Sequence, residues 1–373
     1  MRIVSLGASG HAGSRIAALL APELDAADEL VLAGRSAQRL ARTRTLITSA
    51  AQISTAIVNV EDQQAVRDLV SGADLVIVTV SRPDLIGSLA RIVLEAGADW
   101  LDTMLSTPPK IAALRALEPD ITAAGRCFIT DGGFHPGLPA TLVRWAAERV
   151  DELTEADVTA GLHIDWQADA IDDATIEEML TEFTDFDMVT WIDGVRRRVR
   201  WSECPTVDFG QPIGSQRVIP MGLAEMVDLP RQYPSLQRCG FYVTGFSPAM
   251  DYLALPVVMA MAKVPALHRA NVRFTRWAMT HLAVSRPPYR LVLQTIATGR
   301  ASGIPSQVSV RIAAEDSYLL TAAPVVACVN QWRDGSARRV GLHFQAQVME
   351  PNACFADVTR LGVEVHLGEV TPI

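Results

Sequence analysis

A glycine-rich turn near the start of the chain lies between an apolar strand pattern and a helical pattern. Residues 1–6 are mostly apolar, and residues 14–20 continue with apolar helical periodicity. Such a turn leaves backbone N–H groups at a helix start with no side chain in the way, so a pyrophosphate can approach closely. It also meets the positive end of the helix dipole. The pattern predicts a nucleotide site formed by Gly7, Ser9, Gly10, His11, Ala12 and Gly13.

The end of the next apolar run selects the nucleotide. Residues 30–33 are apolar and lead into Gly34, Arg35 and Ser36, about 20 residues after the glycine turn. Sites that prefer NAD place Asp or Glu here to bind the ribose 2′-hydroxyl, whereas a guanidinium and a hydroxyl suit a 2′-phosphate. We therefore expect NADP(H), bound through Arg35 and Ser36, although a solvated loop arginine is the simpler alternative for Arg35.

Composition indicates a folded protein of more than one domain. The chain has 373 residues, of which 49% are hydrophobic and 20% charged. Its net charge of −9 argues against nucleic acid or an anionic membrane as the main partner. The five cysteines are dispersed, without zinc-ligand spacing, so no metal is expected. Dispersed cysteines and a start that does not resemble a leader predict a cytoplasmic protein.

One apolar stretch needs its own interpretation. Residues 252–268 are strongly apolar but are interrupted by Pro256, Lys263 and Pro265. The uninterrupted part is shorter than the roughly 20 residues of a membrane-spanning helix, so no membrane span is predicted. We expect this stretch to be buried within the fold or against a second copy of the chain in a homodimer.

Strand and helix patterns alternate through the first third of the chain. Strands are expected at 55–60, 75–80, 100–102 and 127–130, with helices at 63–70, 85–96 and 108–124. This alternation predicts an α/β domain over residues 1–132: a doubly wound parallel sheet of the Rossmann type, covered by helices on both faces. Its ligand belongs at the carboxyl ends of the strands, where Thr79, Val80, Ser81, Arg82 and Asp102 lie.

The pattern then changes to strand runs broken by long helices. Strands are expected at 190–193, 195–201 and 290–298, and helices at 173–186 and 250–279. Residues 133–349 are therefore predicted to form a second, α+β domain built on one sheet, for substrate binding and dimerisation. A last helix near 350–373 is expected to pack back on the first domain.

Candidate catalytic and substrate residues lie in two segments. Gly132 and Gly133 permit close approach of backbone to a ligand, and His135 is a candidate proton donor. Asp102 is a candidate for orienting the substrate. The simpler alternatives are that His135 is bonded to the backbone of its own turn and that Asp102 caps the segment that follows it. In the second domain, alternation puts His163 and Asp165 on one face of a strand, and Arg217 is a candidate carboxylate clamp. A solvent-exposed surface would explain these three as well.

Several of these segments together resemble the saccharopine dehydrogenase/reductase-like family. The resemblance rests on the glycine turn, on residues 32–36, on the segment from Asp131 to Pro139, and on residues 318–325 followed by Asp334 and Gly335. It implies an NADP-binding domain, a second domain with substrate contacts and a dimer interface, and a closing C-terminal helix. Members reduce imines formed between an amine and a carbonyl compound, or catalyse the reverse oxidation.

The residues and the resemblance together predict an NADPH-dependent oxidoreductase that acts on a C=N or C–N bond of an amino-acid-derived substrate. Short-chain dehydrogenase chemistry is excluded because no tyrosine has a lysine four residues later. Two alternatives stay open. One is reduction of another bond on the same fold, such as a lipid enoyl group. The other is a non-catalytic NADP-binding sensor or scaffold, since no acid–base pair stands out.

Overall fold

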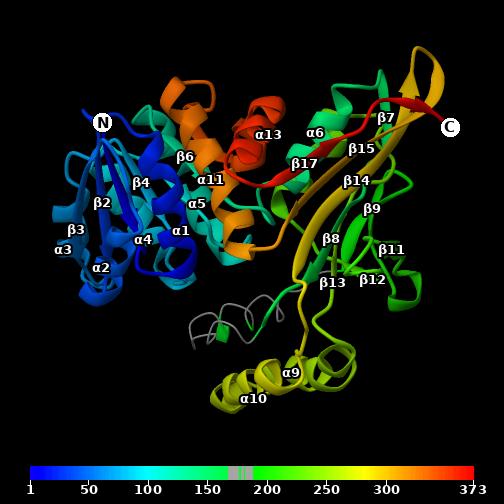
Figure 1. The fold of residues 1–373 in the computed structure, drawn as a ribbon, viewed down its shortest axis with the longest axis horizontal. Coiled ribbons are helices and arrows are strands. Elements are labelled where there is room, and N and C mark those ends of the chain that lie inside the picture. The colour runs from blue at the N-terminus through cyan, green and yellow to red at the C-terminus, as the bar shows by residue number, and fades with distance from the viewer. Residues whose placement is uncertain (167–175, 178–179, 181–187) are drawn as a thin grey trace. The chain divides into compact units, whose positions relative to one another are not determined.

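The protein, seen in a computed structural model that describes residues 1–166, 176–177, 180 and 188–373, divides into two compact units. Unit 1 contains Met1–Leu138 and Tyr318–Val363, and unit 2 contains Pro139–Ser317 and Glu364–Ile373. Each unit has its own β-sheet (Figure 1). The predicted fold class, a doubly wound parallel sheet with a second mixed domain, is confirmed.

Unit 1 is built on a seven-stranded parallel sheet in the order β16-β6-β5-β4-β1-β2-β3. Successive strands proceed outward from β1 in one direction as far as β3 and then in the other direction from β4 to β6. The order therefore reverses beside β1, which is the switch point of a doubly wound sheet. The strands are β1 (Arg2–Leu6), β2 (Glu29–Gly34), β3 (Gln52–Ile57), β4 (Leu75–Val78), β5 (Asp99–Asp102), β6 (Cys127–Thr130) and β16 (Gly341–Phe344).

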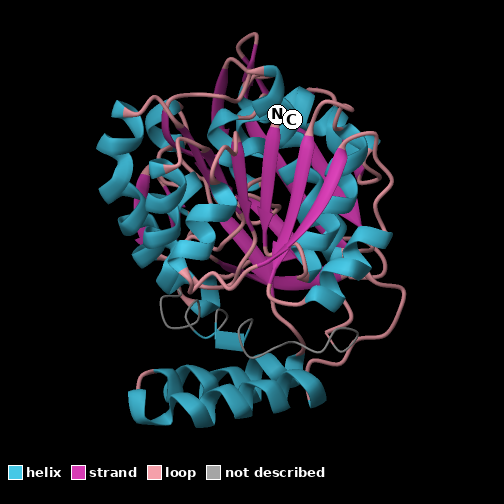
Figure 2. Cartoon of the chain, turned by 90° about the vertical axis from the view of Figure 1, so that its left-hand side faces the viewer, coloured by secondary structure: helices cyan, strands magenta, loops and turns pink. Residues whose placement is uncertain are grey.

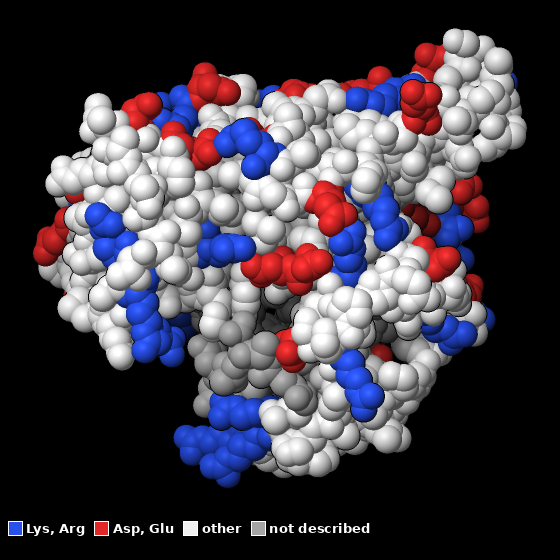
Figure 3. All heavy atoms as spheres, in the orientation of Figure 1, with Lys and Arg blue, Asp and Glu red and all other residues white. Residues whose placement is uncertain are grey.

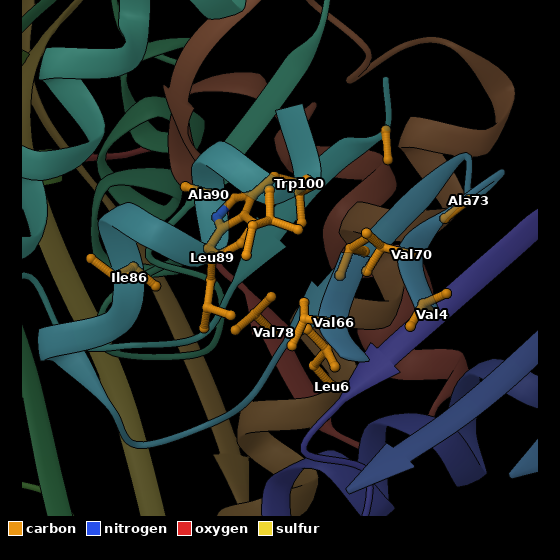
Figure 4. Close-up of a cluster of buried hydrophobic side chains, with 14 of the residues drawn as sticks. Val4, Leu6, Val66, Val70, Ala73, Val78, Ile86, Leu89, Ala90 and Trp100 are labelled. Atoms are coloured by element: carbon orange, nitrogen blue, oxygen red, sulfur yellow. The ribbon is translucent and has the colours of Figure 1, made fainter. Parts of the chain in front are cut away.

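Helices of unit 1 bury apolar stripes against this sheet. In Figure 4, Val66 and Val70 of α3 and Leu89 of α4 lie beside strand residues such as Leu6 and Val78. The spacing of the apolar positions matches the helical repeat, which is why these segments are helices that cover the sheet. The unit's helices are α1 (His11–Leu20), α2 (Ala37–Thr45), α3 (Gln63–Val70), α4 (Ile86–Glu95), α5 (Pro108–Ala123), α11 (Ser317–Asp334), α12 (Gln345–Val348) and α13 (Pro351–Arg360).

The unit boundaries differ from the predicted domains in three places, the first of which is residues 133–138, predicted within the second domain but part of unit 1. Residues 318–349, predicted within the second domain, lie in unit 1 because β16 pairs in parallel with β6. The buried Asp99 also accepts hydrogen bonds from Trp332 Nε1 and Arg338 Nε, at 2.9 and 2.8 Å. Conversely, the last ten residues lie in unit 2, because β17 (Glu364–Leu367) pairs with a strand of its sheet.

Unit 2 contains a mixed sheet in the order β11-β12-β13-β8-β14-β15-β17, with β18 paired to β15 and β7 paired to β14. A separate ribbon pairs β9 with β10, and helix α6 (Pro139–Ala147) is buried along most of its length. The strands are β7 (Glu152–Glu155), β8 (Val158–His163), β9 (Val189–Ile192), β10 (Val195–Arg198), β11 (Thr206–Asp208), β12 (Ser215–Pro220), β13 (Phe241–Thr244), β14 (Arg290–Ala301), β15 (Ile304–Ala314), β17 and β18 (Thr371–Pro372). The predicted helix at 173–186 lies mostly outside the described residues.

Two helical segments of unit 2 lie side by side and form a hairpin, residues 250–284 (Figures 1 and 2). The segment begins with the π-helical turn η5 (Met250–Ala254), which leads into α9 (Leu255–Ala262), and η6 (Pro265–Leu267) then leads into α10 (His268–His281). No helix of the described residues is long and apolar enough to span a bilayer. We call this segment the α9–α10 hairpin.

Candidate cofactor and active site

The ends of four strands in unit 1 lie at one level. Leu6 of β1 is opposite Ala33 of β2 and Val78 of β4, and Val78 is opposite Asp102 of β5. The residues that follow these strands therefore gather at one edge of the sheet. Because the strand order reverses at β1, this edge is where a doubly wound sheet binds its ligand.

The glycine turn is packed so tightly that side chains would not fit. Gly7 has φ 97°, and a Cβ there would lie 2.5 Å from Thr79 Oγ1. A Cβ at Gly13 would lie 2.3 Å from the Gly7 carbonyl oxygen, and the Gly7 N–H donates to Ala33 O at 2.9 Å. The turn is thereby held against the ends of β2 and β4. Only glycine allows this approach.

Helix α1 starts in a way that favours an anion. The first N–H groups of any helix have no carbonyl partner within it. In α2 and α3, Ser36 and Asp62 accept hydrogen bonds from such groups, whereas the N-cap of α1 is Gly10, which has no side chain. The first turn of α1 also contains no acidic residue. The helix dipole and the N–H groups therefore form a cradle that fits a pyrophosphate.

An aromatic contact flanks this cradle. The ring of His11, the first residue of α1, stacks on Tyr318 of α11, with ring centroids 5.1 Å apart and planes 20° apart. His11 is a predicted cofactor residue, whereas Tyr318 was expected only as part of the segment 318–325 that resembles the family. Its position became visible only once α11 was found in unit 1.

The end of β2 carries the groups predicted to bind a 2′-phosphate. Arg35 is exposed, and Ser36 Oγ accepts a hydrogen bond from Arg39 N at 3.3 Å as the N-cap of α2. A Cβ on Gly34 would lie 2.5 Å from Ser9 Oγ, so the glycine turn is adjacent to the end of β2. Arg35 and the start of α2 directly follow Gly34 in the chain, and Ser9 lies beside Gly34 in space. Together these groups fit a phosphate.

The turn after β4 supports the glycine turn. Thr79 donates from both N and Oγ1 to the Leu6 carbonyl oxygen, at 2.8 and 3.0 Å. Val80 and Ser81 follow it and are half-buried. These three residues follow β4 at the ligand edge of the sheet, and their contact with the cofactor stays a prediction.

Arg82 is engaged by two carboxylates. Its Nε and Nη2 donate to Asp84, at 2.8 and 2.7 Å, and its Nη1 donates to Glu61. The hydrogen bond from Arg82 holds the pKa of Glu61 below its usual range, and the charge of Arg35 contributes in the same direction. Because the guanidinium charge is already balanced within unit 1, its contact with a cofactor stays a prediction.

A buried ion cluster joins the ends of β5 and β6. Lys110 of α5 is completely buried, and its Nζ donates to Asp102 Oδ1, to Asp131 Oδ1 and to the Met104 carbonyl oxygen, at 2.8, 2.7 and 2.6 Å. Asp102 also accepts from Trp100 Nε1 at 2.9 Å. These contacts fix both carboxylates, and the role of Asp102 in orienting a substrate stays a prediction.

This cluster contains more acidic groups than basic ones. Two carboxylates share one ammonium group, and all three side chains are inaccessible to solvent. Burial raises the pKa of Asp131, while for Lys110 the effect of burial is outweighed by the carboxylates of Asp102 and Asp131, so its pKa is also raised. The lysine is therefore held in its charged form. Only Lys110 and Lys263 are lysines in the chain, and this rarity is the sequence signal that singles out Lys110.

The turn after β6 is held by one amide side chain. Gln345 of α12 donates to the Gly133 carbonyl oxygen at 3.1 Å and accepts from Gly133 N at 3.3 Å. Gly132 N donates to Asp102 O at 2.7 Å, and Gly133 has φ 133°. The predicted Gly132–Gly133 turn is thus at the ligand edge, and Gln345 is a positioning residue that the sequence analysis missed.

His135 is neutral at physiological pH. Its ring stacks on Phe134, with centroids 3.8 Å apart, and burial lowers its pKa to about 4. A neutral imidazole carries one N–H donor and one acceptor nitrogen. The residue can therefore donate a hydrogen bond at neutral pH, but it holds no extra proton to give.

The predicted substrate residues of unit 2 are only partly brought together. His163 Nε2 lies 2.8 Å from Arg286 O, and its ring is 6.1 Å from that of Tyr289, whose hydroxyl donates to Asp165 at 3.0 Å. His163 and Asp165 thus flank the same tyrosine. Arg217 lies on β12, exposed, with its guanidinium 6.0 Å from the Trp201 ring. Their roles in substrate binding stay predictions.

The glycine turn and the strands around it match a known family model. Residues 3–129 match the model of the saccharopine dehydrogenase NADP binding domain. This segment is similar to that domain. The resemblance inferred from the sequence is therefore confirmed, and NADP(H) is the cofactor of the domain. The match supports an oxidoreductase, while the bond and the substrate belong to the proposal below.

A solved structure shows a similar fold over 98% of the chain. The saccharopine dehydrogenase (L-Glu forming) of Saccharomyces cerevisiae superposes with a TM-score of 0.67 at 14% identity, covering 98% of this chain and 99% of that one. The C. glutamicum DAP dehydrogenase, solved in complex with DAP, is less similar, with a TM-score of 0.49 at 14% identity over 95% of each chain. No curated protein matches the sequence.

Proposed function

We propose that the protein is an NADPH-dependent oxidoreductase that acts on a C=N or C–N bond of an amino-acid-derived substrate. The observation that carries the proposal is the match of residues 3–129 to the saccharopine dehydrogenase NADP binding domain. The similarity of fold over 98% of the chain to a saccharopine dehydrogenase supports it. A fold alone does not fix a substrate, so the bond and the substrate class rest on this family relationship.

The residues of unit 1 are suited to binding and orienting the cofactor. The glycine turn and the start of α1 bind the pyrophosphate, and Arg35 binds the 2′-phosphate. Bound NADPH supplies the hydride for the reduction. The Thr79–Ser81 turn and the Gly132–Gly133 turn then limit where the nicotinamide and the substrate can lie. Most of the rate enhancement in such a reaction comes from this positioning.

Reduction of an imine requires a hydride at carbon and a proton at nitrogen. His135 is neutral at pH 7, so it orients the substrate by hydrogen bonding. The proton added to the imine nitrogen comes from solvent. Asp131 and Asp102 are fully buried and committed to Lys110. They hold the ends of β5 and β6, so Asp102 would orient a substrate through the position of these strand ends.

The test is consumption of NADPH in the presence of amino acids paired with 2-oxo acids. We expect oxidation of NADPH only when both an amine and a carbonyl compound are present, because the imine forms from the two. Oxidation with a carbonyl compound alone, or with an α,β-unsaturated acyl compound, would contradict the assigned bond. Binding of NADPH without turnover of any pair would favour the non-catalytic sensor.

A lipid-like substrate is the second candidate. It is favoured by the large apolar side chains exposed on the α9–α10 hairpin, which a reductase of small polar substrates does not need. The homodimer and the cytoplasmic location predicted from the sequence remain proposals, and the experiment below bears on the homodimer.

A further inference from the structure

The α9–α10 hairpin concentrates exposed apolar side chains. Its most exposed member, Leu253, has 69% of its surface accessible to solvent. Isolated exposed apolar residues are common, but a contiguous group marks an interaction site. The group consists of Tyr252, Leu253, Val257, Val264, Leu267, Trp277 and Val284.

The exposed residues form one side of the first helical segment. In η5 and α9, positions 252, 253, 256, 257 and 260 are exposed, and all of them are apolar. The opposite side is buried, where Met250 and Ala254 pack against Ala278 and Met279 of α10. The buried side of the hairpin therefore packs on the hairpin's own residues and on neighbours outside it, such as Ile176 and Leu180 beside Val258. Its outward side is an exposed apolar stripe, in which the ring of Tyr252 lies edge-on to Trp201, with centroids 6.0 Å apart.

The second helix carries positive charge on its exposed side. Arg269, Arg273 and Arg276 are exposed on α10, at spacings that put them on adjacent turns, with Trp277 beside them. Lys263 is exposed before α10 and Arg286 after it, whereas Asp251 is the one acidic residue among positions 250–286. His268 lies 3.9 Å from the carboxylate of Glu177. Figure 3 shows basic side chains gathered at this end of the molecule, next to white surface.

This local charge opposes that of the whole chain, whose net charge is −9. An apolar stripe, an exposed Trp and Tyr, and a basic stripe on one hairpin are the features of helices that lie in a membrane interface. Neither helix is long enough to span a bilayer, so the hairpin would lie in the plane of the surface.

We propose that the α9–α10 hairpin docks on the surface of an anionic phospholipid bilayer. Its apolar stripe enters the boundary between headgroups and acyl chains, and its arginines contact lipid phosphates. A second copy of the chain fits less well. A symmetric dimer through this face would place the same arginine stripe of each copy at the shared interface, which brings like charges together.

The experiment is sedimentation of the full-length protein with vesicles. We expect it to bind vesicles of equimolar phosphatidylcholine and phosphatidylglycerol but not vesicles of phosphatidylcholine alone. Binding should be lost at about 1 M NaCl, where the Debye length falls to about 3 Å. R269Q and R273Q should each lower the partition coefficient between vesicles and solution about fivefold.

Matched variants separate docking from general surface effects. L253S and V257S should weaken vesicle binding, whereas I57S, at a β3 residue that is 70% exposed, should not. R231Q removes an arginine that is 85% exposed outside the hairpin and should bind like the wild type. Equal binding by hairpin and control variants would overturn the proposal. So would absence of vesicle binding together with a dimer in solution that L253S dissociates, a result that would assign this face to a second copy.

Discussion

Lys110 connects two strand ends that would otherwise place two carboxylates together in the protein interior. Its ammonium group has three acceptors within 2.8 Å, Asp102, Asp131 and the Met104 carbonyl oxygen. A guanidinium is larger and planar, and it would not fit this compact set of acceptors. The geometry gives a physical reason for a lysine in a chain that otherwise uses arginine almost throughout.

We expect Lys110→Met to lower the free energy of unfolding by about 3–5 kcal/mol, because it leaves buried carboxylates without their partner. The matched control is Lys263→Met, at an exposed position, which should change stability by less than about 0.5 kcal/mol. Urea denaturation of both variants measures the difference. Similar midpoints for the two would show that the cluster does not stabilise the fold.

Arg35 decides between the two nicotinamide cofactors. A charge-assisted contact with the 2′-phosphate is worth about 1.5–3 kcal/mol, so Arg35→Ala should weaken NADPH binding roughly 10- to 100-fold and leave NADH binding unchanged. Arg42→Ala removes another exposed arginine from α2 and serves as the control. Titration with each cofactor gives the result, and an Arg35→Ala protein that still prefers NADPH would refute the contact.

His135 should make stability depend on pH. Its pKa is lowered to about 4 in the folded protein, against about 6.5 when unfolded, so the unfolded chain binds the extra proton first. The stabilisation is complete above about pH 6.5 and is lost as the pH falls toward 4, by up to roughly 3 kcal/mol. His135→Gln should lose less stability over this window than the wild type in denaturation at several pH values. Parallel curves for the two proteins would contradict the shift.

At the level of elements, the glycine turn was predictable because its pattern is local. Glycines at positions 7, 10 and 13 directly follow a strand and start a helix, and each feature is visible within twenty residues. In contrast, β16 has four residues and pairs with β6 from more than two hundred residues away. Nothing in Gly341–Phe344 identifies that partner. Gln345 and Tyr318 were missed for the same reason, since they reach the site through this distant pairing.

Gly13 tests the turn as an element. An added Cβ would lie 2.3 Å from the Gly7 carbonyl oxygen, so Gly13→Ala must displace either α1 or the turn. We expect NADPH binding to fall at least tenfold while the sheet stays folded. Gly87→Ala, in α4, is the control because its Cβ would meet only the Ala113 methyl group, at 3.3 Å. Unchanged NADPH affinity in Gly13→Ala, measured by fluorescence titration, would place the cofactor elsewhere.

At the scale of the whole molecule, composition predicted two domains but not their boundaries. Unit 1 receives Tyr318–Val363 and unit 2 receives the last ten residues, so the chain crosses between the units more than once. A composition change along the chain cannot reveal such exchanges, because each segment looks locally like any strand or helix. The substrate is likewise not readable from the pattern, since hydride transfer depends on geometry more than on a residue signature.

The central claim, hydride transfer from NADPH to the carbon of a C=N bond, is tested most directly with NADPH carrying deuterium at the transferred position of the nicotinamide. The protein is incubated with this cofactor and with amino acids paired with 2-oxo acids, and the products are analysed by mass spectrometry. We predict a secondary amine with one deuterium on the carbon next to nitrogen. Deuterium in a reduced C=C or C=O product instead, or in no product although NADPH binds, would contradict the account.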